Sequence, residues 1–351
     1  MKKKVLIEQA FGEDPLFAIA FHPSEKHFVT GTSSGQLTAN TYTEGDSASA
    51  SQAWTTKRHK SSCRAIVYDQ SGEYVFSAGA DRVVKKAVSE TGKVVGKDKD
   101  SMLAGATCMV VNESLLAIGD EDANLCVFDI RTMKKTHSYS GLHDDCVNSI
   151  TDMPFKNKYH FVTAGSTTVT HIDLRKGIVS QSEDQEDEIL SGCIASQKYS
   201  AFGMSEGVVT VWNNNHLEDQ QNRIRLSDGS IDCLIAGEED NEVFAGGADG
   251  IVRKLDVKGS RVDKQNVWTH GEEEEVSMLE LDYDYRLVTG GFESLKIWCK
   301  DDEVDQEEEG EEDDEDEKAK KKRKRSKKTK SNIINMKKQT HVHGISKFDN
   351  L

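Results

Sequence analysis

The chain has 351 residues, 30% of them charged and 7% aromatic, and its 61 acidic and 45 basic side chains leave a formal net charge of −16. Nowhere do about 18 apolar residues run together, so we expect no membrane-spanning helix, and the Val-Leu-Ile after the opening Met-Lys-Lys-Lys is too short for the apolar core of a signal peptide. The seven cysteines include no Cys-x-x-Cys pair, which predicts a reducing compartment and neither a disulfide framework nor a metal site.

Seven times along the chain an apolar run reaches a glycine, passes through a short polar turn and resumes as a second apolar run. Valine, isoleucine, phenylalanine and threonine dominate these runs, as in β-hairpins. The glycines are 38 to 48 residues apart, close to the roughly 40 to 45 residues of a four-stranded propeller blade. We therefore predict an all-β, seven-bladed WD40-type propeller whose blades are marked by Gly31, Gly79, Gly119, Gly165, Gly203, Gly247 and Gly291.

An apolar segment precedes each hairpin and is predicted to be the innermost strand of its blade, at residues 16–21, 63–68, 107–111, 147–151, 190–195, 231–236 and 276–281. Aligned, these segments share a column of mostly compact side chains, as expected where seven strands crowd around one axis. The column reads Ala18, Ala65, Cys108, Ser149, Cys193, Cys233 and Met278, so we expect most cysteines to be packing residues.

The two ends of the predicted ring complement each other. Residues 5–11 form a predicted strand without a hairpin of its own, whereas the last blade stops after Leu-Lys-Ile-Trp at residues 295–298. The N-terminal strand would therefore supply the outer strand of the last blade, which removes two exposed strand edges. This places the propeller at residues 1–300 and a separate tail at residues 301–351.

The composition changes abruptly in the tail. Residues 301–317 include 14 acidic side chains and residues 318–330 include ten lysines or arginines, and such charge density predicts a disordered segment. The basic block has the character of a nuclear localisation signal read by an import receptor, although a solubilising or RNA-binding tail has the same composition. The candidate localisation residues are Lys320, Lys321, Lys322, Arg323, Lys324, Arg325, Lys327 and Lys328.

The predicted propeller keeps most of the negative charge, with 46 acidic and 32 basic residues in positions 1–300. Such a body repels phosphate backbones, so any RNA contact should come through the basic block or a local basic patch. These positions contain no glycine-rich phosphate loop, Gly-x-Ser-x-Gly elbow, His-Glu-x-x-His motif or regularly spaced acid pair. We therefore expect a protein with no enzymatic activity, no catalytic residues and no cofactor.

One motif repeats in consecutive blades. Residues 127–132, Val-Phe-Asp-Ile-Arg-Thr, and 171–177, His-Ile-Asp-Leu-Arg-Lys-Gly, each place Asp-x-Arg at the end of a predicted third strand. They resemble the Trp-Asp-x-Arg element of propellers that dock onto cullin 4 ubiquitin ligases through a damage-binding adaptor, with Phe128 and Ile172 in place of tryptophan. The aspartates are also an ordinary blade signature. The resemblance implies adaptor contacts or turn-holding roles for Arg131, Arg175, Asp129 and Asp173.

The chain as a whole resembles the WD repeat-containing protein 55 family. The likeness rests on the seven degenerate blades, the early Phe-His-Pro-Ser-Glu-Lys-His-Phe at residues 21–28, the two Asp-x-Arg turns and the acidic-then-basic tail. That family has nucleolar relatives in fungi, and the resemblance implies a scaffold in the nucleus and nucleolus that acts in ribosomal RNA processing on the large-subunit path. Its implied partners are pre-ribosomal proteins, and ribosomal RNA through the basic tail.

Two other classes of function stay open. A substrate receptor of a cullin 4 ubiquitin ligase would form a stoichiometric complex with the ligase adaptor. An acidic chaperone for histones or ribosomal proteins would bind basic proteins in a salt-sensitive manner and without ribosomal RNA. None of the three hypotheses involves a membrane.

Overall fold

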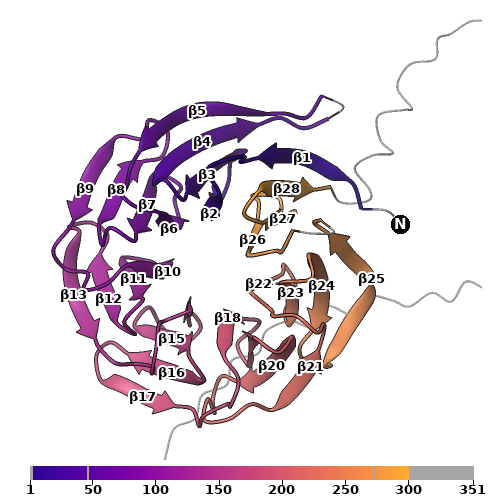
Figure 1. Cartoon of the computed structure of the whole chain (residues 1–351). Helices are drawn as coiled ribbons and strands as arrows, with labels where there is room; N and C mark the ends of the chain where they lie inside the picture. The colour runs from indigo at the N-terminus through magenta and orange to yellow at the C-terminus, as the bar shows by residue number, and fades with distance from the viewer. Residues whose placement is uncertain (1–2, 46, 272–273, 300–351) are drawn as a thin grey trace, which may run out of the picture. The chain divides into compact units, whose positions relative to one another are not determined.

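The computed structural model describes residues 3–45, 47–271 and 274–299. The chain divides into two units, Met1–Val304 and Asp305–Leu351, and the first unit forms the propeller. Seven four-stranded antiparallel sheets radiate from one axis in this unit (Figure 1). The prediction of an all-β, seven-bladed WD40 propeller is confirmed, and every regular element among the described residues is a strand. The predicted disordered tail, residues 301–351, lies outside the described residues.

In blades one to four the strands follow one another along the chain from the axis to the rim. Blade one contains β2 (Leu16–Phe21), β3 (His27–Thr32), β4 (Gln36–Tyr42) and β5 (Ala50–Lys57). Blade two contains β6 (Cys63–Tyr68), β7 (Tyr74–Gly79), β8 (Val84–Val88) and β9 (Val94–Asp98). Blade three contains β10 (Ala106–Asn112), β11 (Leu115–Asp120), β12 (Leu125–Asp129) and β13 (Lys134–Tyr139). Blade four contains β14 (Ser149–Asp152), β15 (His160–Gly165), β16 (Thr168–Asp173) and β17 (Gly177–Gln181).

Blades five and six have the same order, and blade seven differs at its rim. Blade five contains β18 (Ile189–Ile194), β19 (Tyr199–Met204), β20 (Val208–Asn213) and β21 (Asn222–Arg225). Blade six contains β22 (Cys233–Ala236), β23 (Glu242–Gly246), β24 (Ile251–Asp256) and β25 (Arg261–Thr269). Blade seven contains β26 (Met278–Leu281), β27 (Leu287–Gly290) and β28 (Ser294–Trp298), and its outer strand comes from the other end of the chain.

That outer strand is β1 (Val5–Ala10), which pairs antiparallel with β28 (Figure 1). Ile7 of β1 is buried in a cluster that also includes Leu16 of blade one and Ile297 of blade seven. Because β1 precedes blade one in sequence and completes blade seven in space, the ring is closed by hydrogen bonds and apolar packing without an exposed edge on β28.

The innermost strands meet near the axis, with one difference from the sequence alignment. In blade five Ser191, and not Cys193, lies opposite Gly203 on the second strand. The register of β18 shifts between Ile189 and Ser191, and equivalent shifts precede Ala18, Ala65 and Cys108 in other blades. Because residues 191–193 are Ser-Gly-Cys and all three are small, a column chosen for compact side chains does not distinguish them, and the alignment assigns Cys193 wrongly. All seven cysteines are free, and five of them are buried.

Three buried histidines, His59, His143 and His270, brace the connections that lead into blades two, four and seven. His143 is representative: its two ring nitrogens lie 3.0 Å from Thr163 Oγ1 and 2.7 Å from Thr168 Oγ1. Burying an imidazole without hydrogen-bond partners lowers the stability of the fold. These contacts therefore hold each connection against the strands that follow it.

Candidate functional site

The two Asp-x-Arg turns lie on one face of the propeller. Each joins the third and fourth strands of its blade, β12 to β13 and β16 to β17. Because neighbouring strands run antiparallel, these turns share a face with the connections between first and second strands. The backbone bonds agree: Ile130 N donates to Ser114 O at 3.0 Å, and Leu174 N donates to Tyr159 O at 2.9 Å. We call this side, which carries residues 129–134 and 173–177, the turn face.

In blade three the turn is held by Asp129, and the Arg131 side chain takes no part in the hydrogen bonds that hold it. One carboxylate oxygen of Asp129 accepts from the backbone N–H groups of Arg131 at 3.1 Å and Thr132 at 2.8 Å, and from the Thr132 hydroxyl at 2.9 Å. These bonds, first those from Thr132, hold the pKa of Asp129 below its usual value. The Arg131 side chain is exposed and makes no hydrogen bond or ion pair with another described residue.

In blade four the equivalent arginine, Arg175, is already bound within the protein. The guanidinium of Arg175 donates from Nε and Nη2 to the two oxygens of Asp173, both at 2.9 Å, and lies 5.1 Å from the centre of the Tyr159 ring. This paired bond lowers the pKa of the buried Asp173 to about 2. Arg175 therefore has to leave Asp173, or share it, to reach a partner.

Two histidines that the sequence reasoning did not single out lie behind this turn. His160 Nδ1 is 2.9 Å from His171 Nε2, and His160 Nε2 is 3.6 Å from Asp173 Oδ2. Burial lowers the pKa of His171 to about 4, so the pair is neutral at pH 7 and stabilises the turn through hydrogen bonds. Their only signal in the sequence is a histidine in each of two consecutive strands.

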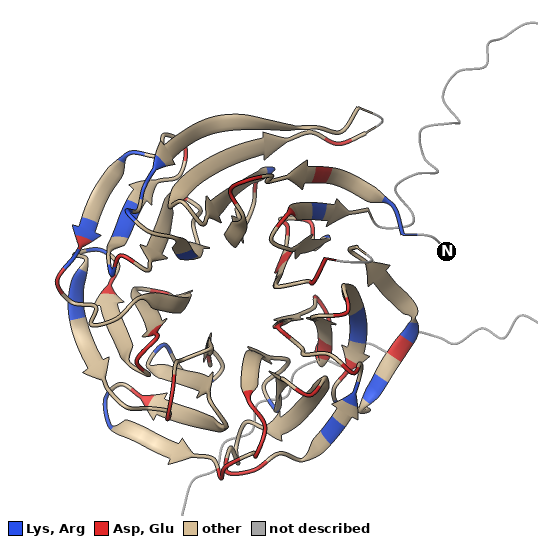
Figure 2. Cartoon of the chain, viewed as in Figure 1, with Lys and Arg blue, Asp and Glu red and all other residues tan. Residues whose placement is uncertain are grey.

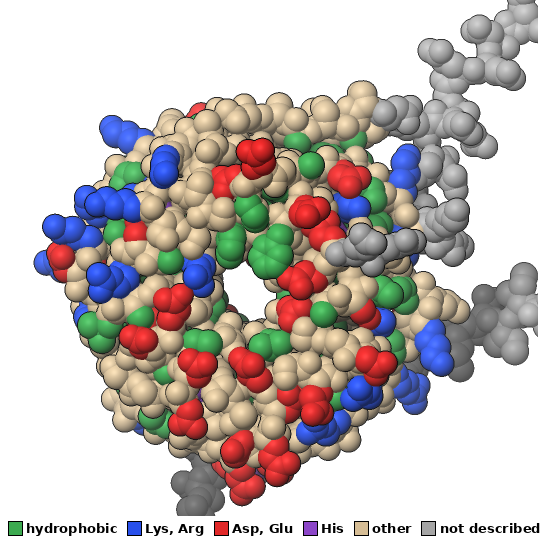
Figure 3. All heavy atoms as spheres, in the orientation of Figure 1, with side chains coloured by type: hydrophobic (Ala, Val, Ile, Leu, Met, Phe, Trp, Pro, Cys, Tyr) green, Lys and Arg blue, Asp and Glu red, His purple; other side chains and the backbone are tan. Residues whose placement is uncertain are grey.

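A basic patch lies on the outer strands of blades two and three, β9 and β13, and the turns beside them (Figures 2 and 3). In the β8–β9 pair Lys85 stands directly opposite Lys97, an arrangement of like charges that does not favour folding. Asp98 lies among the cations, but its carboxylate accepts from the Ser101 backbone and hydroxyl, both at 2.9 Å. The exposed members of the basic patch are Lys93, Lys97, Lys99, Arg131, Lys134 and Lys135.

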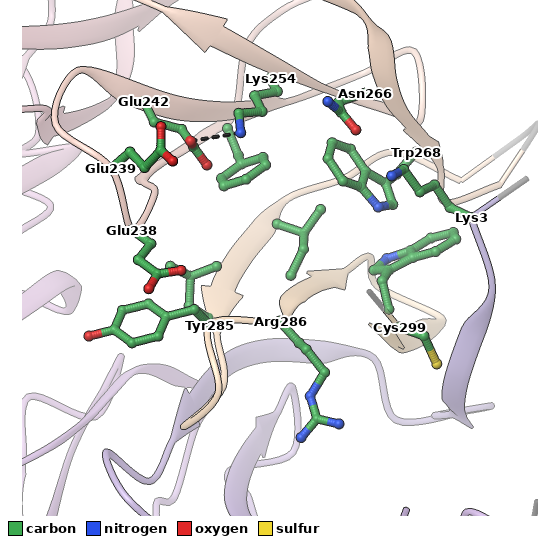
Figure 4. A pocket seen from close by; sticks show the side chains of 14 residues that line it. Lys3, Glu238, Glu239, Glu242, Lys254, Asn266, Trp268, Tyr285, Arg286 and Cys299 are labelled. Carbon is green, nitrogen blue, oxygen red and sulfur yellow. Dashed lines mark ion pairs between the residues drawn. The ribbon is translucent and has the colours of Figure 1, made fainter. Parts of the chain in front are cut away.

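A second surface is a cavity of about 260 Å³ between blades six and seven (Figure 4). Three aromatic side chains, Phe244, Trp268 and Trp298, line it together with Tyr285, which is 56% exposed. Phe244 and Trp268 meet edge to face, with ring centres 5.4 Å apart. Because these rings come from β23, β25 and β28 and the tyrosine from the β26–β27 turn, only the assembled ring of blades brings them together.

Charged groups surround the same cavity, which we call the aromatic pocket. Glu242 pairs with Lys254 at 2.7 Å, whereas Glu238 and Glu239 are exposed and make no ion pair with a described residue. Lys3 Nζ lies 5.2 Å from the centre of the Trp268 ring. The pocket thus combines aromatic faces with carboxylates, which is the chemistry that binds cations.

The first strands of all seven blades line a channel at the axis, which opens at the centre of the face in Figure 3. Asp232 and Glu280 lie in its wall, and burial raises the pKa of both carboxyl groups, that of Glu280 to about 7. Among the residues that the structure describes, no three potential metal ligands gather. Within the same residues, no helix is long and apolar enough to cross a bilayer.

The predicted localisation residues, from Lys320 to Lys328, lie outside the described residues.

The structure brings two of the predicted site residues, Arg131 and Arg175, to one face of the propeller. It also shows the basic patch and the aromatic pocket, which the sequence reasoning missed. A sign of the patch is present in the sequence as five lysines between positions 93 and 135. The aromatic pocket has no such sign, because its rings are scattered over 55 positions.

Residues 51–86 match the WD domain, G-beta repeat family. The matched segment begins in β5, the outer strand of blade one, and ends in β8, the third strand of blade two. The repeat in sequence is therefore offset by one strand from the blade in space. The same offset places β1 on blade seven.

Several relatives are named WD repeat-containing protein JIP5. The protein of Meyerozyma guilliermondii is 36% identical over 84% of this chain and 72% of its own length. For Scheffersomyces stipitis the identity is 39% over 70% of this chain and 53% of the relative, and for Saccharomyces cerevisiae it is 37% over 72% and 57%. The chain thus spans from about half to somewhat under three-quarters of the length of these relatives.

These names overturn the expected membership of the WD repeat-containing protein 55 family. That expectation rested on features that follow from propeller geometry and from charge composition, and neither distinguishes one propeller family from another. What holds is the coarser statement: this is a WD-repeat propeller, a fold that generally serves as a non-enzymatic scaffold for protein interactions. With 36% identity over most of both sequences, the chain belongs to the family of WD repeat-containing protein JIP5.

Proposed function

We propose that this protein is an interaction scaffold of nucleolar ribosome biogenesis that acts in ribosomal RNA processing on the large-subunit path. The observation that carries the proposal is the separation of charge along the chain. Residues 1–300 hold 46 acidic and 32 basic side chains, whereas residues 318–330 hold ten lysines or arginines. The basic block suits an import receptor, and the acidic propeller suits basic partners such as ribosomal proteins.

Ribosomal RNA is the second proposed partner. The basic block supports this contact, and so does the basic patch, where Lys97 and Lys134 are exposed on a propeller whose total charge is negative. Phosphate contacts need only positioned lysines and arginines, and they weaken as salt is added. The RNA contact would therefore use two cationic regions of the chain, while pre-ribosomal proteins contact the acidic surfaces.

Depletion and purification test the proposal together. Depleting the protein should leave large-subunit ribosomal RNA precursors unprocessed, as measured by hybridisation with probes across the spacers. Affinity purification of the full chain, followed by mass spectrometry and RNA sequencing, should recover pre-ribosomal proteins with those precursors. Normal precursor processing in depleted cells would contradict the proposal.

The same purification separates the two alternatives. A stoichiometric complex with a cullin 4 ligase adaptor would favour the ligase-receptor hypothesis, for which the exposed Arg131 on the turn face is the structural support. Recovery of histones or free ribosomal proteins without ribosomal RNA, lost at moderate salt, would favour the acidic chaperone.

A further inference from the structure

We propose that the aromatic pocket between blades six and seven binds a lysine or arginine side chain from an extended basic segment of a partner protein. The inference rests on the proposed scaffold function and deepens it, because it assigns a site to the basic partners.

The aromatic wall already holds a cation of this chain. Lys3 Nζ lies 5.2 Å from the centre of the Trp268 ring, a distance at which the negative face of an indole attracts an ammonium group. Figure 4 shows Lys3 and Trp268 at one end of the pocket and Tyr285 with Glu238 at the other. An incoming cation therefore has a second aromatic face, that of Tyr285, at the end opposite Lys3.

The acidic side chains at the Tyr285 end are available. Glu238 and Glu239 are exposed and make no ion pair with a described residue, whereas Glu242 is neutralised by Lys254. The other cation in the lining, Arg286, pairs with Asp282 at 2.8 Å and with Glu44. Figure 4 shows its guanidinium directed away from the aromatic rings, so the local field at this end is negative.

Tyr285 is presented outward by a backbone conformation that does not suit it. Its φ is +57°, in the left-handed region that bulky residues rarely adopt. The turn is held by its own bonds, with Tyr285 N donating to Asp282 O at 3.0 Å and Arg286 N donating to the Asp282 carboxylate at 2.9 Å.

Among the described residues, the Tyr285 side chain forms no ring contact and no hydrogen bond that would offset this strain. It is 56% exposed. Backbone strain that no contact within the protein offsets is typical of binding sites. An exposed tyrosine at the edge of a pocket is a common anchor for a partner protein.

The size of the pocket sets the class of ligand. Its volume of about 260 Å³ is below the range of roughly 300 to 1,000 Å³ that is usual for small-molecule and cofactor sites. One long, unbranched cationic side chain fits, with its stem on the aromatic faces and its charge toward the carboxylates. A basic segment would thus anchor one residue in the pocket and lie across Glu238 and Glu239.

Binding of a fluorescent peptide of alternating lysine and serine to the full chain tests the site. We expect the double substitution E238Q/E239Q to weaken binding about five- to tenfold at low salt and to flatten its salt dependence. The matched control D144N/D145N removes two exposed acidic charges from the connection between blades three and four and should bind like the wild type. A peptide with glutamine in place of lysine should not bind. Equal weakening by both double variants would overturn the proposal, because the acidic surface as a whole would then be the binder.

The substitution Tyr285→Asn separates binding from folding. Asparagine tolerates the left-handed region better than tyrosine, so the melting temperature should stay the same or rise, while peptide binding should weaken about threefold or more. Unchanged binding by this variant would also overturn the proposal. Because the peptide contains no ribosomal sequence, loss of the site and loss of the proposed function are distinguishable: a working pocket with normal RNA processing after depletion contradicts only the function.

Discussion

Arg131 and Arg175 occupy equivalent positions in neighbouring blades, yet their side chains are held differently. Arg175 is bound at two points by the buried Asp173, whereas Arg131 is exposed and makes no such bond. A guanidinium without an internal partner can form a paired contact with a carboxylate or phosphate at no internal cost. The turn of blade three is therefore the better candidate for a contact, and the turn of blade four is better explained as part of the blade.

We predict that replacing both arginines by alanine leaves the protein folded and functional. Alanine at position 175 leaves the buried carboxylate of Asp173 without its paired guanidinium, so we expect the unfolding free energy to fall by about 1 to 3 kcal/mol and the protein still to fold. In cells depleted of the native protein, the variant R131A/R175A should restore processing of large-subunit RNA precursors. A variant that is folded but fails to restore processing would make these turns the functional site and would favour the ligase-receptor hypothesis.

Buried histidines make the stability of the propeller depend on pH. Burial lowers the pKa of His143 from 6.5 to about 4. The unfolded chain therefore binds the proton more readily than the folded protein. This contribution to stability is complete above about pH 6.5 and is lost as the pH falls toward 4.

We predict that the variant His143→Gln is less sensitive to acid than the wild type. Glutamine keeps polar atoms near Thr163 and Thr168 but does not titrate, so the loss of unfolding free energy between pH 7 and pH 4.5 should be smaller by about 1 to 3 kcal/mol. Urea unfolding at several pH values measures this difference. Between pH 7 and pH 8, where this contribution is complete, the variant and the wild type should show the same dependence on pH, which is the control. Equal acid sensitivity of His143→Gln and the wild type would contradict the prediction.

At the scale of elements, β1 is the strand on which ring closure depends. It pairs with β28 along its length, and Ile7 is only 5% exposed. Loss of β1 would therefore remove its hydrogen bonds to β28 and also weaken the packing between the first and last blades.

We predict that deleting residues 1–11 lowers the unfolding free energy by roughly 3 kcal/mol or more, since it removes a buried isoleucine and exposes the edge of β28. Deleting residues 301–351 should have a much smaller effect. Denaturant unfolding of the two truncated proteins at equal concentration compares them. Equal stabilities would show that β1 does not close the ring.

At the scale of the whole molecule, the basic patch and the basic block are two groups of cationic side chains that differ in character. The basic patch belongs to folded strands, and the basic block belongs to residues 318–330. An import receptor reads lysines and arginines that are clustered along the sequence, so the block suits this role, whereas the patch combines residues from separate strands and does not.

We predict that six alanines in place of residues 320–325 abolish nuclear accumulation of a fusion too large to diffuse through nuclear pores. The control carries alanine at six positions of the basic patch and should accumulate in the nucleus like the wild type. Imaging of both fusions in the same cells makes the comparison. Nuclear retention of the first variant would mean that the protein enters with a partner. The six control positions are Lys93, Lys97, Lys99, Arg131, Lys134 and Lys135.

The sequence by itself determined the number of blades and the class of their strands. Alternating apolar residues and turn glycines are local properties, and they recur at the period of one blade, so counting the seven glycines identifies the ring. The register of blade five was not predicted correctly, because Ser191, Gly192 and Cys193 are all small and a pattern of compact side chains does not distinguish them. The family was not predicted correctly either, because the features used to infer it belong to propellers in general.

Only the tertiary structure decided which side chains share a surface. The aromatic pocket joins Phe244, Trp268, Tyr285 and Trp298, which lie on four different elements of two blades. The structure also separated two arginines that look alike in sequence, since the bond from Arg175 to Asp173 depends on a rotamer and on the neighbouring Tyr159 ring. Strand patterns depend on neighbours in sequence, whereas binding surfaces depend on how the blades are packed. For that reason the sequence determined the ring, and only the assembled ring determined the pocket.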